Sequence, residues 1–282
     1  MSKENYLSKT IMSFLLLTTI IVLAACGSSP KEDIKVSSWE KLKEKGEIVV
    51  ATSGTLYPVS FHDGESKELT GYEVEIMKEL GKRLDLDIKF VEMGLDGMLT
   101  SLNSGQVDLA VNDIEITSER EKKFAFSEPY KYSFGTAIVR KSDHSGIESL
   151  KDLKGKKAAG AATSIYMQVG RDNGAEEVIY DNVTNDVYLR DVEIGRTDVI
   201  LNDYYLQKLA LKAFPEFEIM IHPDIKYHPN VQAIIMKKDS KELLEQVNTV
   251  LAGMKDDGTI SQLAEKFFDG EDVSIEKDYD FE

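Results

Sequence analysis

The chain has 282 residues, of which 42% are hydrophobic and 30% charged, a balance typical of an ordinary soluble protein. Its formal net charge of −16 argues against nucleic acid as a partner and against membrane binding through basic patches. The length allows one large domain or two smaller lobes, each with an adequate hydrophobic core.

Residues 1–25 predict a signal peptide that is not part of the fold. Two lysines precede an apolar run, Ile11 to Val22, which is too short to span a membrane. The run ends in small residues directly before Cys26, the only cysteine, and this pattern resembles a bacterial lipobox. The resemblance implies that Cys26 becomes a lipidated N-terminus, held at the membrane by more than one acyl chain. A capped Cys26 leaves no thiol for nucleophilic catalysis, thiol exchange or a cysteine-based zinc site.

A polar tether at 26–37 follows, and from residue 38 short apolar strands alternate with amphipathic helices, as in an α/β fold. The first half predicts strands at 48–51, 88–91 and 107–111 and helices at 72–84 and 96–103. The second half predicts strands at 134–141, 157–162, 178–180, 199–201 and 231–237, and helices from about 163, at 185–192, after Ser240 and at 258–268.

These two sets of elements predict two lobes rather than one sheet. The first lobe is expected to comprise 38–133 and 232–270, and the second 134–231, joined by two extended crossings. The acidic tail at 271–282 has few apolar residues and is expected to fray.

Arg120 is the first candidate functional residue. Thr117 is predicted to cap a helix whose first turn contains Glu119, where the helix dipole favours an acid. Arg120 goes against that preference, and a residue placed against its local preference is a functional candidate. Its guanidinium, beside free backbone N–H groups, could bind both oxygens of a carboxylate. The alternative is a solvated helix arginine.

Asp203 is the second candidate, at the end of the strand predicted at 199–201. An acid at the carboxyl end of such a strand lies where α/β sheets bind ligands. The alternative is a helix N-cap before Tyr204. If Arg120 and Asp203 face each other from opposite lobes, they match the two charges of an amino acid.

Motifs for catalysis, metals and cofactors are missing from the sequence. It contains no nucleophile elbow, zinc-protease motif, phosphate loop or dinucleotide fingerprint. The four histidines are scattered along the chain, and His222 and His228, each before a proline, are predicted to lie in loops. We therefore expect neither an enzyme nor a metal or cofactor site.

With these features in place, residues 38–268 resemble the solute-binding proteins of polar amino-acid ABC importers, solute-binding protein family 3. The motifs that carry the resemblance are LTGYEV (69–74), DGML (96–99), SGQVD (104–108), TSER (117–120), FSEPY (126–130) and GRTD (195–198). Further stretches, at 53–63, 127–141, 151–167, 196–211 and 221–230, are similar to the L-cystine-binding lipoproteins of Gram-positive bacteria. The resemblance implies a two-lobe periplasmic-binding-protein-like fold of type II, with two extended hinge strands.

The resemblance also implies a role for each matching residue. Arg120 would bind the ligand carboxylate, helped by the backbone N–H of Thr117, and Asp203 would bind the ammonium. Further contacts would come from Thr163 and Ser164 at a second-lobe helix start, from Asn112 and Glu115 in the first lobe, and from Ser53 and Tyr57 in a loop that lines the cleft. Glu115, Asp113 and Tyr132 are candidates for the far end of cystine. The chain departs from the family at Ser53, where many members carry an acid, and at Leu95, where many carry tryptophan.

The implied function is capture of L-cystine and delivery to the permease and ATPase subunits of an ABC importer. The protein would be a monomer, anchored through Cys26 on the extracytoplasmic face of a Gram-positive cell membrane. Three alternatives stay open: another polar or sulfur-containing amino acid as ligand, a sensor domain, and a dehydratase on the same fold.

Overall fold

The computed structural model describes residues 37–279, and its strands form two five-stranded sheets and one small three-stranded sheet. The predictions of a signal peptide at 1–25 and of lipidation at Cys26 lie outside the described residues, as does all of the tether except Ser37. Between residues 37 and 279, no helix is both long and apolar enough to cross a bilayer.

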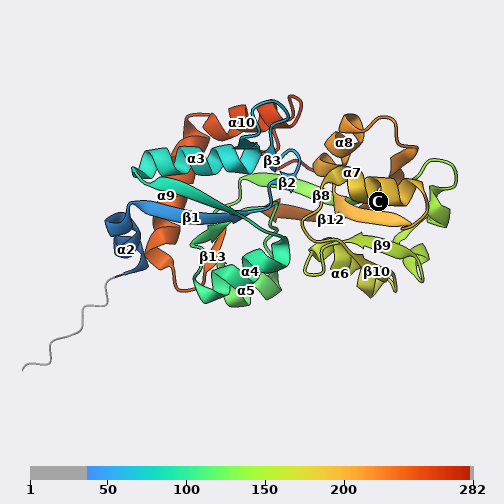
Figure 1. The fold of residues 1–282 in the computed structure, drawn as a ribbon, viewed down its shortest axis with the longest axis horizontal. Coiled ribbons are helices and arrows are strands. Elements are labelled where there is room, and N and C mark those ends of the chain that lie inside the picture. Colours follow the sequence, from blue (N-terminus) through green and yellow to red (C-terminus); the bar gives the residue numbers. More distant parts are fainter. Residues whose placement is uncertain (1–36, 280–282) are drawn as a thin grey trace, which may run out of the picture. The chain divides into compact units, whose positions relative to one another are not determined.

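The first sheet has the strand order β5-β1-β6-β13-β7. The first three of these strands pair in parallel, and β13 pairs antiparallel to β6 and β7. Helices α3, α9 and α10 lie on one side of this sheet and α4 and α5 on the other (Figure 1). The elements of this lobe are α2 (Ser38–Lys45), β1 (Glu47–Thr52), α3 (Tyr72–Leu84), β5 (Asp87–Glu92), α4 (Leu95–Ser104), β6 (Leu109–Ala110), α5 (Ser118–Lys123), β7 (Phe124–Phe126), β13 (Ile235–Lys237), α9 (Lys241–Asp256) and α10 (Thr259–Phe267). The small sheet, β2 (Thr55–Leu56), β3 (Ser60–His62) and β4 (Leu69–Thr70), follows β1 in the chain.

The second sheet has the strand order β10-β9-β11-β8-β12. Here β10, β9 and β11 are parallel, while β8 is antiparallel to both of its neighbours. The elements are β8 (Lys131–Arg140), η1 (His144–Gly146), η2 (Leu150–Leu153), β9 (Lys157–Gly160), α6 (Ile165–Asp172), β10 (Glu176–Ile179), α7 (Asn185–Glu193), β11 (Val199–Asp203), α8 (Tyr204–Ala213) and β12 (Ile219–Gln232). This α/β architecture confirms the predicted fold class.

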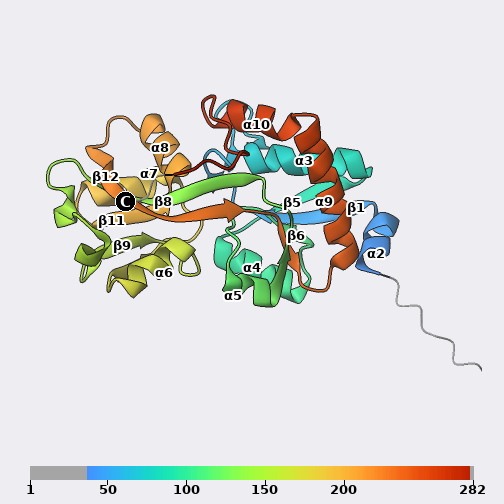
Figure 2. The same ribbon diagram turned by 180° about the vertical axis from the view of Figure 1, so that it is seen from behind.

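The two long strands β8 and β12 carry the chain between the two sheets and run side by side (Figure 2). At their hinge end Lys131 pairs with Gln232, and the chain then enters β13 of the first sheet. The single strand predicted at 231–237 is therefore wrong, because its two ends belong to different sheets. The loop predicted around His222 and His228 is also wrong, because both residues lie on β12.

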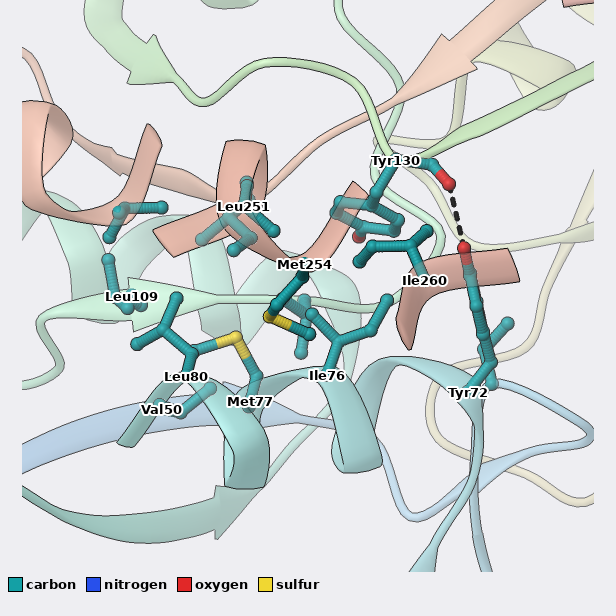
Figure 3. Close-up of a cluster of buried hydrophobic side chains, with 14 of the residues drawn as sticks. Val50, Tyr72, Ile76, Met77, Leu80, Leu109, Tyr130, Leu251, Met254 and Ile260 are labelled. Atoms are coloured by element: carbon teal, nitrogen blue, oxygen red, sulfur yellow. Dashed lines mark hydrogen bonds between the residues drawn. The ribbon is translucent and has the colours of Figure 1, made fainter. Parts of the chain in front are cut away.

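The apolar face of α3 anchors the first lobe. Its side chains Ile76, Met77 and Leu80 are fully buried against Leu251 and Met254 of α9 (Figure 3). The hydroxyl of Tyr72 donates a hydrogen bond to the backbone oxygen of Tyr130, at 2.7 Å, and so ties α3 to the start of β8. Each such buried side chain stabilises the fold by roughly 1.5–3 kcal/mol, and because Val50 and Leu109 belong to the same cluster, it fixes α3 and α9 against β1 and β6.

The segment after α10 packs against both lobes. Phe268 and Val273 are buried, and the backbone oxygen of Val273 accepts a hydrogen bond from the N–H of Tyr132 on β8. Glu271 forms an ion pair with Lys208 on α8. The prediction that the acidic tail frays is therefore wrong for residues 271–279, because apolar and ionic contacts hold that part of it.

Gly71, directly before α3, occupies a backbone conformation that other residues rarely adopt. Its φ is 131°, and a Cβ atom there would lie 2.4 Å from the backbone oxygen of Val59. We expect Gly71→Ala to lower the free energy of unfolding by about 2–4 kcal/mol, because strain and a backbone clash add. Gly64→Ala is the matched control, since a Cβ atom there meets nothing within 4 Å. Urea denaturation of both variants checks this, and equal losses of stability would contradict it.

Candidate ligand-binding site

A cavity lies where the strands of the two sheets end, with about 140 Å³ of room for the centres of water molecules. Because one water needs roughly 10–15 Å³ on this measure, the space suits a small solute. The first lobe lines it with Ser53, Thr55, Leu56, Gly94, Leu95, Asn112, Asp113, Ile114, Glu115 and Arg120. The second lobe lines it with Ala159, Gly160, Ala161, Ser164, Ile165, Tyr166, Tyr180, Asp181, Asn182, Val183, Tyr188, Ile200, Leu201, Asn202 and Leu206.

Arg120 is the cation of this cavity. The Thr117 side chain caps α5 by accepting a hydrogen bond from the N–H of Arg120, at 3.2 Å. The guanidinium donates from Nη1 to the backbone oxygen of Glu115, at 2.9 Å, and from Nη2 to that of Thr163, at 3.1 Å. Burial lowers the pKa of Arg120, but an arginine stays charged in this setting. Both acceptors are neutral carbonyls, and in the part of the chain that the structure describes no carboxylate forms an ion pair with Arg120.

Oxygen acceptors form part of the first-lobe wall. Asn112 Oδ1 and Glu115 Oε2 are buried, with no hydrogen-bond partner among residues 37–279. Asp113 is buried beside them, and its Oδ1 lies 2.8 Å from Lys131 Nζ. Burial is the main cause that raises the pKa of Asp113 to about 8. Because buried acceptors without donors are unfavourable, this wall suits a ligand that carries N–H groups.

Asp203 does not line the cavity. Its side chain is fully buried, Oδ2 accepts a hydrogen bond from Lys131 Nζ at 2.6 Å, and Oδ1 caps α8 by accepting from Leu206 N at 2.9 Å. Burial alone would lower the pKa of Lys131, but Asp113 and Asp203 together raise it, so the lysine is charged. The helix cap that was the alternative for Asp203 is present, and direct contact of Asp203 with an ammonium stays a prediction.

The structure brings five of the nine predicted site residues together at the cavity and leaves four outside its lining. Those that line it are Ser53, Asn112, Glu115, Arg120 and Ser164, and those that do not are Tyr57, Thr117, Thr163 and Asp203. Tyr57 packs edge-on against Phe61 instead, and Tyr132 lines a separate hollow beside the hinge strands. The helix expected from about Thr163 begins at Ile165, with Ser164 as its N-cap.

Hydrogen bonds between the lobes join the two walls of the cavity. Thr55 Oγ1 donates to Asn182 Oδ1 at 3.1 Å, and the N–H of Thr163 donates to Asp96 Oδ1 at 3.2 Å. Together with the contact of Arg120 to Thr163, they hold the lobes against each other around the enclosed space.

The second-lobe residues that supply much of the wall were not predicted from the sequence. Tyr166 on α6, Tyr188 on α7, and Tyr180 and Asn182 in the segment after β10 all line the cavity. The one signal that could have indicated Asn182 is its position just after β10, because the ends of parallel strands bind ligands. Tyr180 shares that position, whereas Tyr166 and Tyr188, on helices α6 and α7, carry no such local signal.

His228 extends the site towards solvent, because its Nε2 forms a hydrogen bond with Glu115 Oε1. That bond is the main cause that raises the pKa of His228, while partial burial lowers it. A raised folded-state pKa stabilises the protein below the unfolded pKa of about 6.5, and the stabilisation is lost as the pH rises through the folded value. Because the imidazole is partly exposed, we expect its contribution to be at most about 1 kcal/mol.

We therefore expect His228→Asn to lose more stability at pH 6 than at pH 8, relative to the unchanged protein. Urea denaturation at both pH values measures this difference, and the comparison at each pH cancels the titration of the other histidines. A difference that is equal at both pH values, or larger at pH 8, would contradict the assignment.

Comparison with known proteins shows which family the chain resembles in sequence. Residues 48–270 match the bacterial extracellular solute-binding proteins, family 3. The chain is 59% identical over 275 residues to the probable ABC transporter extracellular-binding protein YckB of Bacillus subtilis, covering 97% of this chain and 96% of YckB. It is 33% identical over 273 residues to the L-cystine-binding protein TcyA of Bacillus subtilis, covering 95% of this chain and 100% of TcyA.

A solved structure agrees with the fold. The amino-acid ABC transporter substrate-binding protein AbpA of Streptococcus pneumoniae, bound to L-arginine, superimposes with a TM-score of 0.74 at 29% identity, covering 84% of this chain and 100% of AbpA. The fold is thus the two-lobe periplasmic-binding-protein-like fold that the sequence predicted. On the family match and on the identity to YckB and TcyA, the chain belongs to family 3 of the bacterial extracellular solute-binding proteins.

Proposed function

We propose that this protein captures a free amino acid in the cavity and delivers it to an ABC importer. The observation that carries the proposal is Arg120, a cation at the cavity wall whose two hydrogen bonds go to neutral carbonyls. A ligand carboxylate can accept from the same fork and be held by both oxygens. The ABC-transporter names of YckB and AbpA support this reading.

The ammonium of the ligand would meet the oxygen acceptors of the first-lobe wall, Asn112, Asp113 and Glu115. Each of the three carries a buried side-chain oxygen that lacks a hydrogen-bond donor in residues 37–279; in Asp113 this is Oδ2, because Oδ1 is paired with Lys131. Asp203 would not contact the ammonium. It would act indirectly, through its ion pair with Lys131, which also pairs with Asp113. Ser53 and Ser164, which also line the cavity, would complete the polar contacts, with Thr163 and Thr117 holding Arg120 and its helix in position. Tyr57 would act only through its edge-on packing against Phe61.

L-cystine is our first candidate ligand, supported by the identity to TcyA and by the sequence stretches that resemble cystine-binding lipoproteins. Cystine has two amino-acid ends, and the second end would need further polar groups. Asp181 and Asn182 on the opposite wall can supply them, beside the rings of Tyr166 and Tyr180. Glu115 and Asp113 are shared with the first end, and Tyr132 would need to move from its separate hollow.

L-Arginine is the second candidate, because AbpA binds it and because the same cavity carries carboxylates that suit a guanidinium. Asp181 and Glu115 are the acids that would pair with it. Other polar or sulfur-containing amino acids fit the same wall with fewer contacts.

Binding would close the two lobes around the ligand, with β8 and β12 as the hinge. A Kd near 1 μM corresponds to about −8 kcal/mol. A few charge-assisted hydrogen bonds at roughly 1.5–3 kcal/mol each reach this scale after the cost of ordering the lobes is subtracted. This mechanism needs no acid–base chemistry, so we propose a binding protein rather than an enzyme.

A thermal-shift screen tests the ligand. The panel holds the free amino acids together with L-cystine, cystathionine and djenkolic acid, each well above a micromolar Kd. A true ligand at 100 times its Kd stabilises the folded state by about 2.7 kcal/mol, or roughly 5–10 °C in Tm. A shift with cystine alone supports the first candidate, a shift with arginine supports the second, and chemical change of any ligand would revive the dehydratase alternative.

We further propose that the mature protein is a monomer anchored by lipid on Cys26 at the outer face of the cell membrane, from where it delivers the ligand to an importer made of ABC permease and ATPase subunits. Cys26→Ala should then move the protein from the membrane fraction to the medium. Fractionation measures this change, and retention of the variant in the membrane would contradict the anchor.

A further inference from the structure

Three side chains that can bind a metal ion lie together in the second lobe, away from the ligand cavity. They are His144 on η1, Glu148 just after it, and His222 on β12, and their ligand atoms all lie within 4.8 Å of one another. No metal site was expected from the sequence, because the histidines are far apart along the chain. The pairing of β8 with β12 brings them together near Arg140, at the end of β8 opposite the hinge. None of the three lines the ligand cavity.

The backbone holds the two imidazoles in place. The register of β12 against β8 shifts between Ile221 and Lys226, and His222 lies in this irregular stretch, where a bulge can re-aim a side chain. The turn that carries His144 is fixed by Asp143 Oδ1, which accepts a hydrogen bond from Ser145 N at 2.9 Å. The two histidine rings meet edge to face, with centroids 4.8 Å apart.

His222 supplies the second observation. The residue is only 1% exposed, and its Nε2 has no hydrogen-bond partner among the described residues. This nitrogen lies 3.8 Å from Glu148 Oε2, while His144 Nδ1 lies 3.6 Å from Glu148 Oε1. A buried ring nitrogen without a partner is unfavourable, so the carboxylate between two imidazoles marks a place where a cation would satisfy all three groups.

The distances are close to those of a metal site. Zinc binds histidine nitrogen and carboxylate oxygen at about 2.0–2.2 Å, so neighbouring ligands of a tetrahedral ion lie about 3.3 Å apart. The two contacts of Glu148 exceed that spacing by a few tenths of an ångström, and its side chain is 74% exposed and free to adjust. One bond must open: Nδ1 of His222 accepts from Asp224 N at 3.2 Å, and a metal on Nε2 moves the ring proton to Nδ1.

We propose that His144, Glu148 and His222 bind a divalent transition-metal ion, with Zn²⁺ as the best fit and water as the fourth ligand. Two imidazoles and one carboxylate suit Zn²⁺ and other ions of that class, whereas Ca²⁺ prefers six or more oxygens. The site is separate from amino-acid binding and does not depend on it.

Isothermal titration of the full chain with ZnCl₂, without a histidine tag and without amino acids, tests the proposal. The titration should show one saturable site. In a thermal denaturation of the same protein, Zn²⁺ at a concentration above its Kd should raise the Tm by at least 3 °C. Glu148→Gln and His144→Gln, at partly exposed positions, should each weaken Zn²⁺ binding by roughly tenfold or more. His62→Gln is the matched control, because it removes another histidine–glutamate pair, His62 with Glu92, and should leave the Kd unchanged.

Spectra of ¹⁵N-labelled histidine identify the ligands directly. Zn²⁺ should shift the ring signals of His144 and His222 and leave those of His62 and His228 in place, and CaCl₂ should shift none of them. Absence of binding at 1 mM ZnCl₂, an unchanged Kd in Glu148→Gln, or ring shifts confined to His62 and His228 would each overturn the proposal.

Discussion

Arg120→Ala should raise the Kd of the amino-acid ligand by roughly a hundred- to several-thousand-fold. Removing one partner of a buried charge pair costs about 3–5 kcal/mol, and every 1.4 kcal/mol is a factor of ten in affinity. The loss has a structural reason: Arg120 alone among the residues lining the cavity carries a guanidinium, and its fork reaches from the backbone of Glu115 to that of Thr163 across the lobes. Calorimetric titration with the ligand identified by the thermal-shift screen measures the change.

Two further variants show whether the loss of affinity in Arg120→Ala comes from a lost contact between the guanidinium and the ligand. Arg120→Lys keeps the charge but not the two-pronged geometry, so its Kd should lie between those of the unchanged protein and of Arg120→Ala. Arg83→Ala removes a partly buried arginine on α3 that pairs with Glu79 and Asp257 and does not line the cavity, and it should change the Kd less than twofold. If Arg120→Ala also changes the Kd by only a few-fold, Arg120 does not bind the ligand carboxylate.

The predicted bounds of an element were most accurate where apolar residues recur regularly along it. Helix α3 has the bounds that its apolar face predicted, Tyr72–Leu84, because the buried side chains recur at helical spacing over its whole length. The strand β12 was missed because two prolines interrupt it. It is an edge strand, and Pro223 falls within a shift of register, so the prolines remove no hydrogen bond that the sheet needs.

The site was predictable only where one residue carries a signal of its own. Arg120 was predicted because a cation in the first turn opposes the helix dipole, although in the six-residue helix α5 it also belongs to the last turn, where the dipole favours a cation. At Asp203 the same residue type serves both a ligand and a helix cap, so the sequence left both possibilities open. Its partner Lys131 lies 72 positions away, and nothing near either residue indicates that they meet. The cluster of His144, Glu148 and His222 depends in the same way on the pairing of β8 with β12, which brings His144 to His222.

Lys131→Met should lower the free energy of unfolding by about 3–5 kcal/mol, the largest loss of stability we expect from one substitution. Lys131 is fully buried, and its Nζ lies 2.8 Å from Asp113 Oδ1 and 2.6 Å from Asp203 Oδ2. Without it two buried carboxylates face each other unpaired, at the cost of a broken buried ion pair. Urea denaturation measures the loss, and Lys131→Met combined with Asp203→Asn should recover part of it because one of the two charges is gone.

Asp203→Asn then decides how the acid takes part in binding. Asparagine caps a helix as well as aspartate does, so α8 keeps its N-cap while the charge on residue 203 is removed. If Asp203 acts only through Lys131 and Asp113, the Kd of the ligand should rise by less than about tenfold, while the protein loses stability. A rise of a hundredfold or more would mean that the ligand ammonium displaces Lys131 and binds Asp203 directly, as the family resemblance implied. The two outcomes differ by more than 1.4 kcal/mol in binding, so a single calorimetric titration separates a carboxylate that touches the ligand from one that holds a lysine in place.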